Sequence, residues 1–352
     1  MIRKQQRFRL SGALLAILLI PCLVLAKDKP YAGVVVFGDS LSDPGNAFFL
    51  SGINLKPPYE TLDDFLIPDA PYARGGNHFS NGATWVEQLG KKLDLGDSVK
   101  PAFKGENGDA LKRTNYAVGG ARARDDGINI NLNAQLGAFF SDSQGVATMD
   151  ALYVIALGGN DVRDAVAAFS IDPTGQASND ILQDALMSLA DSIIALHGAG
   201  ATKLLIVNSP DISLTPAIQR LDLLFPGSAL GAAMASHQFN MNLLALQEEL
   251  SIAFPGMEIA QLDVFQILHD IQTDPAGFGL KNVMDACVMP NQPPYACKKP
   301  KRYLFWDGIH PTRAGHRIYA REAMQILNLG DVEDPDPSKD HEDEDRSDKR
   351  RK

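Results

Sequence analysis

The chain has 352 residues, of which 45% are hydrophobic and 22% are charged, and its formal net charge is −10. These proportions exclude a wholly disordered chain, a collagen-like chain and a small disulfide-packed scaffold, and the length allows a large buried core. Three cysteines are too few for a four-thiolate metal cluster, and the acidic balance disfavours nucleic acid as a partner.

The first 26 residues have the pattern of a secretory signal peptide. Four basic residues and no acidic residue accompany an apolar run from Leu10 to Ala26 that Pro21 interrupts. A membrane anchor usually needs about 20 unbroken apolar residues. We therefore predict a secreted or periplasmic protein that is cleaved after Ala26. Cys22 raises the alternative of a lipoprotein, which we consider weaker because Pro21 is a poor residue to precede a lipid-carrying cysteine.

Cleavage after Ala26 would leave two cysteines, Cys287 and Cys297, ten positions apart. In an exported chain such a pair favours one local disulfide, and two free buried thiols are the alternative. At the other end, Asp331–Lys352 holds ten acidic and six basic residues. Such a segment cannot bury enough apolar surface to fold, so 331–352 is predicted to be a charged disordered tail. One folded domain, without internal repeats, is expected over 27–330.

Short apolar runs typical of strands alternate along this domain with longer runs of helical periodicity. In chain order we predict strand Gly33–Phe37, helix Ala83–Leu93, strand Lys112–Ala117, helix Asn131–Phe140, strand Ala151–Leu157, helix Ser178–His197, strand Thr202–Val207, helix Gly227–Phe254, strand Met257–Val264 and helix Thr312–Leu327. Strands separated by helices favour right-handed crossovers and a parallel sheet covered on both faces. The predicted fold is a three-layer α/β/α sandwich.

Two stretches, Leu50–Asn81 and Asp274–Tyr303, do not fit this alternation and are rich in loop-forming residues. Long loops in a compact domain are often functional, and ligands of an open parallel sheet bind beyond the carboxyl ends of its strands. We predict that both stretches form walls facing a substrate.

The first predicted strand runs into Gly38-Asp39-Ser40. A serine just past a buried strand and close to a glycine is held rigid and exposed, as a nucleophile must be. It does not form the G-x-S-x-G elbow, because position 42 is serine, and alone the motif is more often a simple turn.

A serine nucleophile needs a base, and Asp307 and His310 stand three positions apart in a glycine-containing turn before the last helix. One carboxylate there would hold the imidazole Nδ1–H while Nε2 faces Ser40. The alternative is that Asp307 caps the helix, but Thr312 is the better candidate for that cap.

Donors for a developing oxyanion are suggested by two further motifs that follow predicted strands, Val118-Gly119-Gly120 and Gly158-Gly159-Asn160. The backbone N–H of Gly120 and the side-chain amide of Asn160 would converge on a carbonyl oxygen held near Ser40. Each Gly-Gly pair by itself is more often a tight turn.

Taken together, these blocks resemble the GDSL branch of the SGNH hydrolases. The matching motifs are G-D-S-L-S-D at Gly38–Asp43, F-S-N-G at Phe79–Gly82 followed by Trp85-Val86, N-Y-A-V-G-G at Asn115–Gly120, G-G-N-D at Gly158–Asp161 and D-G-I-H-P at Asp307–Pro311. Their order agrees from Gly33 to about Leu327, and no catalytic position departs from the pattern. The departures lie in the loops and the charged tail.

The resemblance implies a flavodoxin-like parallel sheet and a role for each matching residue. Ser40 matches the nucleophile, His310 the general base and Asp307 its orienting partner. The oxyanion hole would be formed by the N–H of Ser40, the N–H of Gly120 and the side chain of Asn160.

Other signals are interpreted as structural. His78, His197, His237, His269 and His316 are expected at the surface or at helix ends, since none has metal-ligand spacing, and no cofactor is implied. A basic cluster, Lys298, Lys299, Lys301 and Arg302, is more simply a solvated loop than a site for a phosphate headgroup or an anionic membrane.

The expected function is that of an exported serine ester hydrolase of the lipase, esterase or phospholipase kind, acting through an acyl-enzyme on Ser40. Its partners would be an ester or lipid substrate and, transiently, a lipid surface. The resemblance favours lipid esters over acetylated sugars, leaving a carbohydrate acetylesterase or an acyltransferase on the same site as alternatives. A catalytically silent binding or adhesion protein is the alternative from another class.

Overall fold

In the computed structural model, residues 29–104 and 112–329 are described. The predicted signal peptide and charged tail lie outside these residues. A parallel sheet is formed by β1 (Val34–Gly38), β2 (Leu152–Ala156), β3 (Lys203–Val207) and β4 (Glu258–Leu262), in that spatial order. Its register aligns Phe37 with Ile155 and Ile155 with Ile206.

The predicted strand Lys112–Ala117 is not a regular strand. It forms an isolated parallel bridge between Asn115 and Val36, on the edge of β1 away from β2. Val36 N–H donates to Thr114 O at 2.9 Å, and Tyr116 N–H donates to Val36 O at 2.8 Å. With this segment counted, the chain order across the sheet is 2-1-3-4-5, the flavodoxin-like order.

The five predicted helices are present with shifted ends: α2 (Trp85–Lys92), α3 (Leu132–Asp142), α5 (Gln176–Ala199), α7 (Ser228–Ala253) and α9 (Arg313–Ile326). Four helices in the described residues were not predicted: α1 (Asn46–Ser51), α4 (Gly159–Ala168), α6 (Pro216–Leu224) and α8 (Val264–Thr273). The short strands β5 (Asn282–Ala286) and β6 (Tyr303–Phe305) were not predicted either, and neither were the 3-10 turns η1 (Ala73–Gly75), η2 (Ala102–Lys104), η4 (Ile212–Leu214) and η5 (Pro300–Arg302). Among the described helices, none has the length and apolarity needed to cross a membrane.

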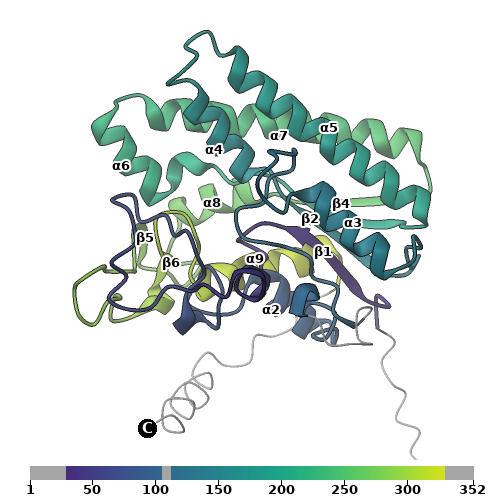
Figure 1. Cartoon of the computed structure of the whole chain (residues 1–352), viewed down its shortest axis with the longest axis horizontal. Helices are drawn as coiled ribbons and strands as arrows, with labels where there is room; N and C mark the ends of the chain where they lie inside the picture. The colour runs from purple at the N-terminus through teal and green to yellow at the C-terminus, as the bar shows by residue number, and fades with distance from the viewer. Residues whose placement is uncertain (1–28, 105–111, 330–352) are drawn as a thin grey trace, which may run out of the picture.

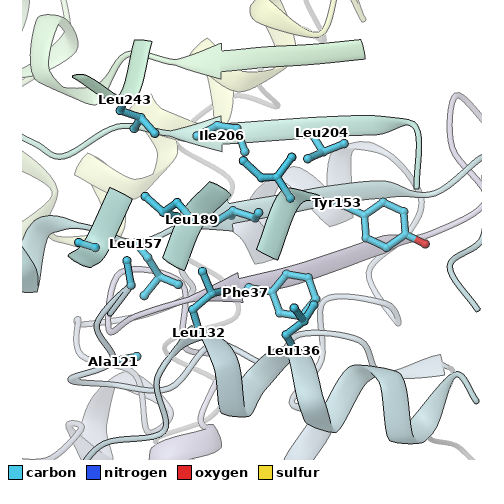
Figure 2. Close-up of a cluster of buried hydrophobic side chains, with 14 of the residues drawn as sticks. Phe37, Ala121, Leu132, Leu136, Tyr153, Leu157, Leu189, Leu204, Ile206 and Leu243 are labelled. Carbon is cyan, nitrogen blue, oxygen red and sulfur yellow. The ribbon is translucent and has the colours of Figure 1, made fainter. Parts of the chain in front are cut away.

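The two faces of the sheet build separate apolar cores because side chains alternate along each strand. One core joins Phe37, Tyr153 and Ile206 to α3, α4, α5 and α7 (Figure 2). The other joins Val36, Val154 and Leu205 to α2, α8 and α9. In Figure 1, α5 and α7 accordingly lie above the sheet and α2 and α9 below it. The three-layer α/β/α sandwich is confirmed.

A third, smaller core lies between the two long stretches that were predicted as walls. Tyr59 and Tyr72 from the first stretch pack with Cys287 and Val288 from the second and with Trp306. The sulfur atoms of Cys287 and Cys297 are bonded to each other within this core. The core therefore forms directly beside Asp307, the residue that follows Trp306.

Candidate active site

Ser40 lies at the carboxyl end of β1, in a turn that the sequence around it stabilises. The Leu41 N–H donates to the side chain of Asp39 at 2.9 Å, and the Ser42 N–H donates to the Asp39 carbonyl at 3.1 Å. A Cβ at Gly38 would lie 2.9 Å from the Cβ of Ser42, so this tight turn requires a glycine there. Ser40 itself is 8% exposed. The turn therefore holds the Ser40 hydroxyl beyond the carboxyl end of β1, where ligands of open parallel sheets bind.

The structure brings Ser40, His310 and Asp307 into one hydrogen-bonded chain. His310 Nε2 lies 2.8 Å from Ser40 Oγ, and His310 Nδ1 lies 2.8 Å from Asp307 Oδ2. Asp307 also accepts from the backbone N–H groups of Ile309 and His310, at 2.9 and 2.8 Å. Asp307 is 0% exposed and His310 is 2% exposed. Thr312 caps α9, with its side chain accepting from Gly315 N–H, so Asp307 is left free to hold the imidazole.

Tyr72 is a site residue that the sequence reasoning missed. Its hydroxyl donates to Asp307 Oδ2 at 2.9 Å, across 235 positions of sequence. Its ring lies edge-on between those of Tyr59 and Trp306, at 5.5 and 5.6 Å between centroids. Burial and the Asp307 carboxylate raise the pKa of Tyr72 well above its ordinary value, so the hydroxyl stays a donor. No local motif could have pointed to this contact.

The F-S-N-G segment supports the turn that carries His310. The Phe79 ring lies 5.4 Å from the imidazole of His310. Ser80 Oγ donates to Pro311 O at 2.8 Å, and Asn81 Oδ1 accepts from the N–H of Arg313 at 2.7 Å. These contacts give this sequence block a positioning role around the histidine turn.

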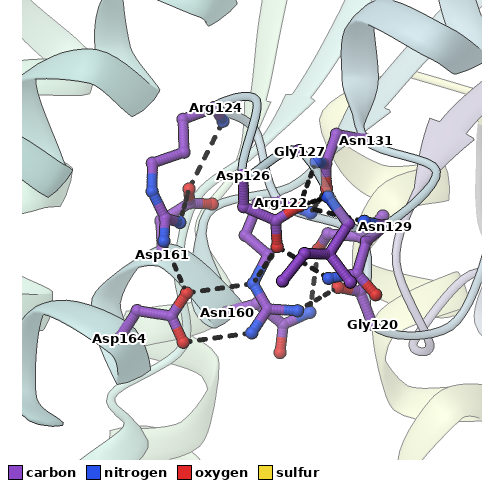
Figure 3. A network of polar contacts seen from close by, with 12 residues as sticks. Gly120, Arg122, Arg124, Asp126, Gly127, Asn129, Asn131, Asn160, Asp161 and Asp164 are labelled. Atoms are coloured by element: carbon purple, nitrogen blue, oxygen red, sulfur yellow. Dashed lines mark hydrogen bonds and ion pairs between the residues drawn. The ribbon is translucent and has the colours of Figure 1, made fainter.

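Asn160 and Gly120, the predicted oxyanion donors, lie next to one another. Asn160 is the second residue of α4, and its Nδ2 donates to Ala121 O at 2.8 Å (Figure 3). Gly120 has φ +81°, a conformation that favours glycine, and Gly158 before α4 has φ +129°. Among the described residues, no acceptor takes the backbone N–H of Ser40 or of Gly120. Both N–H groups are therefore free to bind a substrate oxygen.

An ion-pair network fixes the loop after Gly120 to α4 (Figure 3). Arg122 Nε and Nη2 donate to Asp164 at 3.0 and 3.1 Å, and Arg124 donates to Asp161 at 3.0 Å and to Asp164 at 2.8 Å. Asp161 also accepts from Ala123 N–H at 2.8 Å and is 0% exposed. The aspartate of the G-G-N-D motif thus holds the two donor-bearing segments together.

Asp43, the last residue of the G-D-S-L-S-D motif, connects the turn after Ser40 to the Gly119-Gly120 segment. It accepts from the backbone N–H groups of Gly45, Asn46, Ala47 and Gly119, the last at 2.9 Å. Burial raises its pKa to about 6, against the lowering effect of these four donors. Asp39, beside the nucleophile, likewise has its pKa raised to about 6 by burial.

A cavity of about 60 Å³ opens at Ser40 and is mostly apolar. Apart from Ser40 and His310, it is lined by Asp39, Leu41, Ile67, Gly159, Asn160, Arg163, Pro210, Ile212, Thr215, Ala217, Ile218 and Ile309. Ile67 comes from the first predicted wall. The prediction that Asp274–Tyr303 also faces the substrate is wrong for this cavity, because that stretch packs against the first wall instead. The segment from Pro210 to Ile218 takes its place.

Two of the remaining histidines contradict their predicted exposure. His78 is 8% exposed and pairs with Glu87 at 2.8 Å, and His316 is 1% exposed beneath the site. Burial lowers the pKa of His316 to about 3. The basic cluster Lys298, Lys299, Lys301 and Arg302 is exposed and does not line the cavity. In the described residues, no group of three or more His, Cys, Asp or Glu side chains is arranged to hold a metal ion.

A parallel α/β sandwich with a hydrogen-bonded Ser-His-Asp chain at its strand ends is the arrangement of a serine hydrolase. A family model described as GDSL-like Lipase/Acylhydrolase matches residues 34–323. The chain belongs to this family and is a carboxylic ester hydrolase.

Similar proteins include two GDSL esterase/lipases of Arabidopsis thaliana, each 27% identical to this chain. One match covers 87% of this chain and 86% of the relative, and the other covers 84% and 88%. Among solved structures, a catalytic mutant of an acetylxylan esterase from Geobacillus stearothermophilus is 14% identical with a TM-score of 0.42, over 85% of this chain and 94% of that one.

Proposed function

We propose that this protein is an exported hydrolase that cleaves carboxylic esters through an acyl-enzyme on Ser40. The observation that carries the proposal is the continuous hydrogen-bond chain from Ser40 Oγ through His310 to Asp307. His310 Nε2 takes the hydroxyl proton as Oγ attacks the ester carbonyl, and it returns that proton to the leaving alcohol. Water, deprotonated by the same imidazole, then releases the acid and restores Ser40.

Charge that develops on the carbonyl oxygen would be bound by the N–H of Ser40, the N–H of Gly120 and the amide of Asn160. One of the two amide hydrogens of Asn160 is committed to Ala121 O, which leaves the other for the substrate. A single donor of this kind typically contributes about 10²- to 10³-fold to kcat. A catalytically silent binding protein would not need this set of donors together with the Ser-His-Asp chain.

The cavity supports an acyl chain better than a sugar, because its walls are mostly apolar. We therefore propose lipid esters, including phospholipids, as the substrate class. Contact with a lipid surface would be made by the apolar tip where α6 meets α7, defined by Leu223, Leu224, Phe225, Leu230 and Met234. These side chains are 83, 65, 63, 67 and 64% exposed.

Helix α6 contributes both to the catalytic cavity and to the apolar tip. Ala217 and Ile218, in the first turn of α6, line that cavity, and the exposed leucines stand at the other end of the same helix. From Leu223 to Gln247 the chain carries no Asp, Glu, Lys or Arg, although the protein as a whole is acidic. Exposed apolar patches of this kind are uncommon on monomeric soluble proteins and often mark a contact surface. A lipid surface bound at this tip would bring its ester groups close to the cavity.

Export is proposed from the sequence of residues 1–26 and is supported by the disulfide between Cys287 and Cys297, since such bonds persist in oxidising compartments. Mass spectrometry of protein recovered from the exported fraction should find Lys27 as the first residue. A chain retained in the cytosol with Met1 intact would contradict export.

Labelling with a fluorophosphonate tests the proposed function directly. The wild-type protein should be labelled at Ser40 and should hydrolyse a soluble short-chain ester, and Ser40→Ala should lose both properties with its fold unchanged. Ser42→Ala is the matched control, two positions away in the same turn. Ester turnover that survives in Ser40→Ala would overturn the proposal.

A further inference from the structure

Arg163 projects from α4 into the catalytic cavity, and the established family assignment gives it no role. Gly159, Asn160 and Arg163 all line this cavity. Positions three and four apart share a helix face, so the guanidinium stems from the turn directly after the proposed oxyanion donor. An arginine placed there stands about 5–6 Å along the helix surface from Asn160.

Arg163 differs from its two arginine neighbours in having no carboxylate partner. Arg122 and Arg124 between them occupy the carboxylates of Asp161 and Asp164 on the same helix. In contrast, Arg163 makes no hydrogen bond and no ion pair with any residue of 29–104 or 112–329. It is nevertheless partly buried. The N–H donors of its guanidinium are therefore available to a ligand in the cavity.

Three carboxylates near Arg163, those of Asp164, Asp39 and Asp63, attract its guanidinium through space but form no hydrogen bond with it. Burial, followed by repulsion from Arg122, lowers the pKa of the guanidinium from its ordinary value, and a guanidinium still remains charged at neutral pH. Asp39 lies on the same cavity, but its carboxylate accepts from the Leu41 N–H and not from Arg163. Among the described residues that line the cavity, Asp39 is the one carboxylate, and most of the others are apolar.

We propose that Arg163 is a specificity-determining residue that binds an anionic group of the ester substrate. The ligand chemistry is a carboxylate or a phosphate diester, either of which a guanidinium binds in a forked geometry. The anion would sit within about one helical turn of the scissile carbonyl, with the apolar walls taking the hydrocarbon part. This inference rests on the proposed function, since it names the substrate class of the same site.

The test compares pairs of related esters in which one member carries an anionic group that the other lacks. Ethyl hydrogen succinate carries a carboxylate where ethyl pentanoate has a methyl end, which places the anion on the acyl side. Dibutanoylglycerophosphocholine carries a phosphate diester that tributanoylglycerol lacks, which places the anion on the alcohol side. The readout is the ratio of kcat/KM for the charged ester to that for the neutral ester, and a general loss of activity cancels from this ratio.

Wild-type enzyme should prefer the charged member of at least one pair. Arg163→Gln should lower that ratio by about 10- to 100-fold, as expected for a hydrogen-bonded charge, and Arg163→Lys should retain part of it. Arg220→Gln is the control, because Arg220 is exposed on α6 and does not line the cavity. The pair that responds identifies the source of the anion.

Ratios that are the same in wild type and Arg163→Gln would overturn this inference while leaving the proposed function intact. Absence of labelling and of neutral-ester turnover in wild type would instead refute the proposed function. If Arg163→Gln does not fold, the inference can be tested on the wild-type enzyme alone, by measuring how anionic and neutral compounds inhibit the hydrolysis of ethyl pentanoate. Glutarate should then inhibit at least about 10-fold more strongly than uncharged glutaramide, and equal inhibition would overturn the inference.

Discussion

Asp307 shows at the scale of single residues how the site is held. Its two oxygens accept from the imidazole of His310, from two backbone N–H groups of its own turn and from the hydroxyl of Tyr72. A carboxylate with this many donors is fixed in orientation, and it fixes the ring that it contacts. The geometry of the nucleophile therefore depends on a residue that does not touch it.

Asp307→Asn should keep the fold but slow turnover by up to about 10⁴-fold. If the new amide donates to Nδ1, the imidazole proton moves to Nε2, which then cannot accept from Ser40. If the amide oxygen accepts from Nδ1–H instead, the stabilising negative charge of the carboxylate is lost. Steady-state kcat on a soluble ester measures the effect. Asp285→Asn, on the exposed edge of β5, serves as the control. A near-normal kcat for Asp307→Asn would reduce Asp307 to a structural turn residue.

Tyr72→Phe removes one donor from Asp307 and should lower kcat by about 3- to 10-fold, in line with the loss of one hydrogen bond. Tyr59→Phe provides a closely matched control. The Tyr59 hydroxyl is buried without a hydrogen-bond partner in the described part of the chain, and its ring packs edge-on against Tyr72. Equal kcat values for the two variants would show that the Tyr72 hydroxyl does not act on the site.

Residues that belong to short motifs could be predicted, and residues that depend on distant contacts could not. Ser40, Asn160 and His310 stand at strand ends or in turns, where a local pattern carries the signal. Tyr72 reaches Asp307 from 235 positions away, and Arg163 matters because its neighbours are already paired. Neither circumstance is visible in a single sequence.

At the scale of elements, the longest helices and the central strands followed from periodicity, but the walls of the site did not. The start of α4 looks like a simple Gly-Gly turn, and α6 has only nine residues, too few for a clear helical pattern. The segment Lys112–Ala117 was predicted as a strand but forms a bridge with only one residue of β1, Val36. Tertiary contacts decide the state of such short segments.

The apolar tip of α6 and α7 should anchor the enzyme to lipid. Leu223→Ser combined with Phe225→Ser should weaken binding to phosphatidylcholine vesicles by at least about 10-fold, because each side chain contributes roughly 1.5–3 kcal/mol when buried. Turnover of a monomeric ester should remain, since these side chains do not line the cavity. Vesicle sedimentation and activity on vesicle-borne ester provide the two measurements.

Ile252→Ser is the control for this pair, since Ile252 is 80% exposed at the opposite end of α7. Vesicle binding that falls equally in both proteins would contradict the assignment of the tip. A change in oligomeric state that the double substitution abolishes would assign the tip to a second copy of the chain instead.

Three apolar cores make up the interior of the described residues, and two of them contain the residues that precede the catalytic turn, Phe305 and Trp306. Two lie on opposite faces of the sheet, and the third joins the wall segments beside Trp306. His316 belongs to α9, which packs in the same core as Phe305. Its Nδ1 is buried and has no partner among the described residues. Acidification should therefore act on the stability of the entire domain through this ring.

The pKa of His316 is about 3 in the folded chain and 6.5 ordinarily, so the unfolded chain binds the proton more readily between these values. Stability from this group is present above pH 6.5 and is lost as the pH falls toward 3. The free energy of unfolding of wild type relative to His316→Leu should fall by roughly 2 kcal/mol between about pH 7 and about pH 5. Urea unfolding at each pH measures this difference.

Asp39 and Asp43 have the opposite effect in this range, because burial raises their pKa values to about 6 and protonation then favours the folded state. They are present in both proteins, so they cancel from the comparison. Parallel pH profiles for wild type and His316→Leu would contradict the assignment to His316.

Trapping the acyl-enzyme tests directly whether Ser40 is the nucleophile. Rapid acid quenching during turnover of a soluble ester, followed by peptide mass spectrometry, should find one acyl group on the peptide that contains Ser40. His310→Ala should abolish both the adduct and turnover, because the hydroxyl would lose its base. Rapid turnover with an acyl group on another residue, or turnover that persists in Ser40→Ala, would show that Ser40 is not the nucleophile.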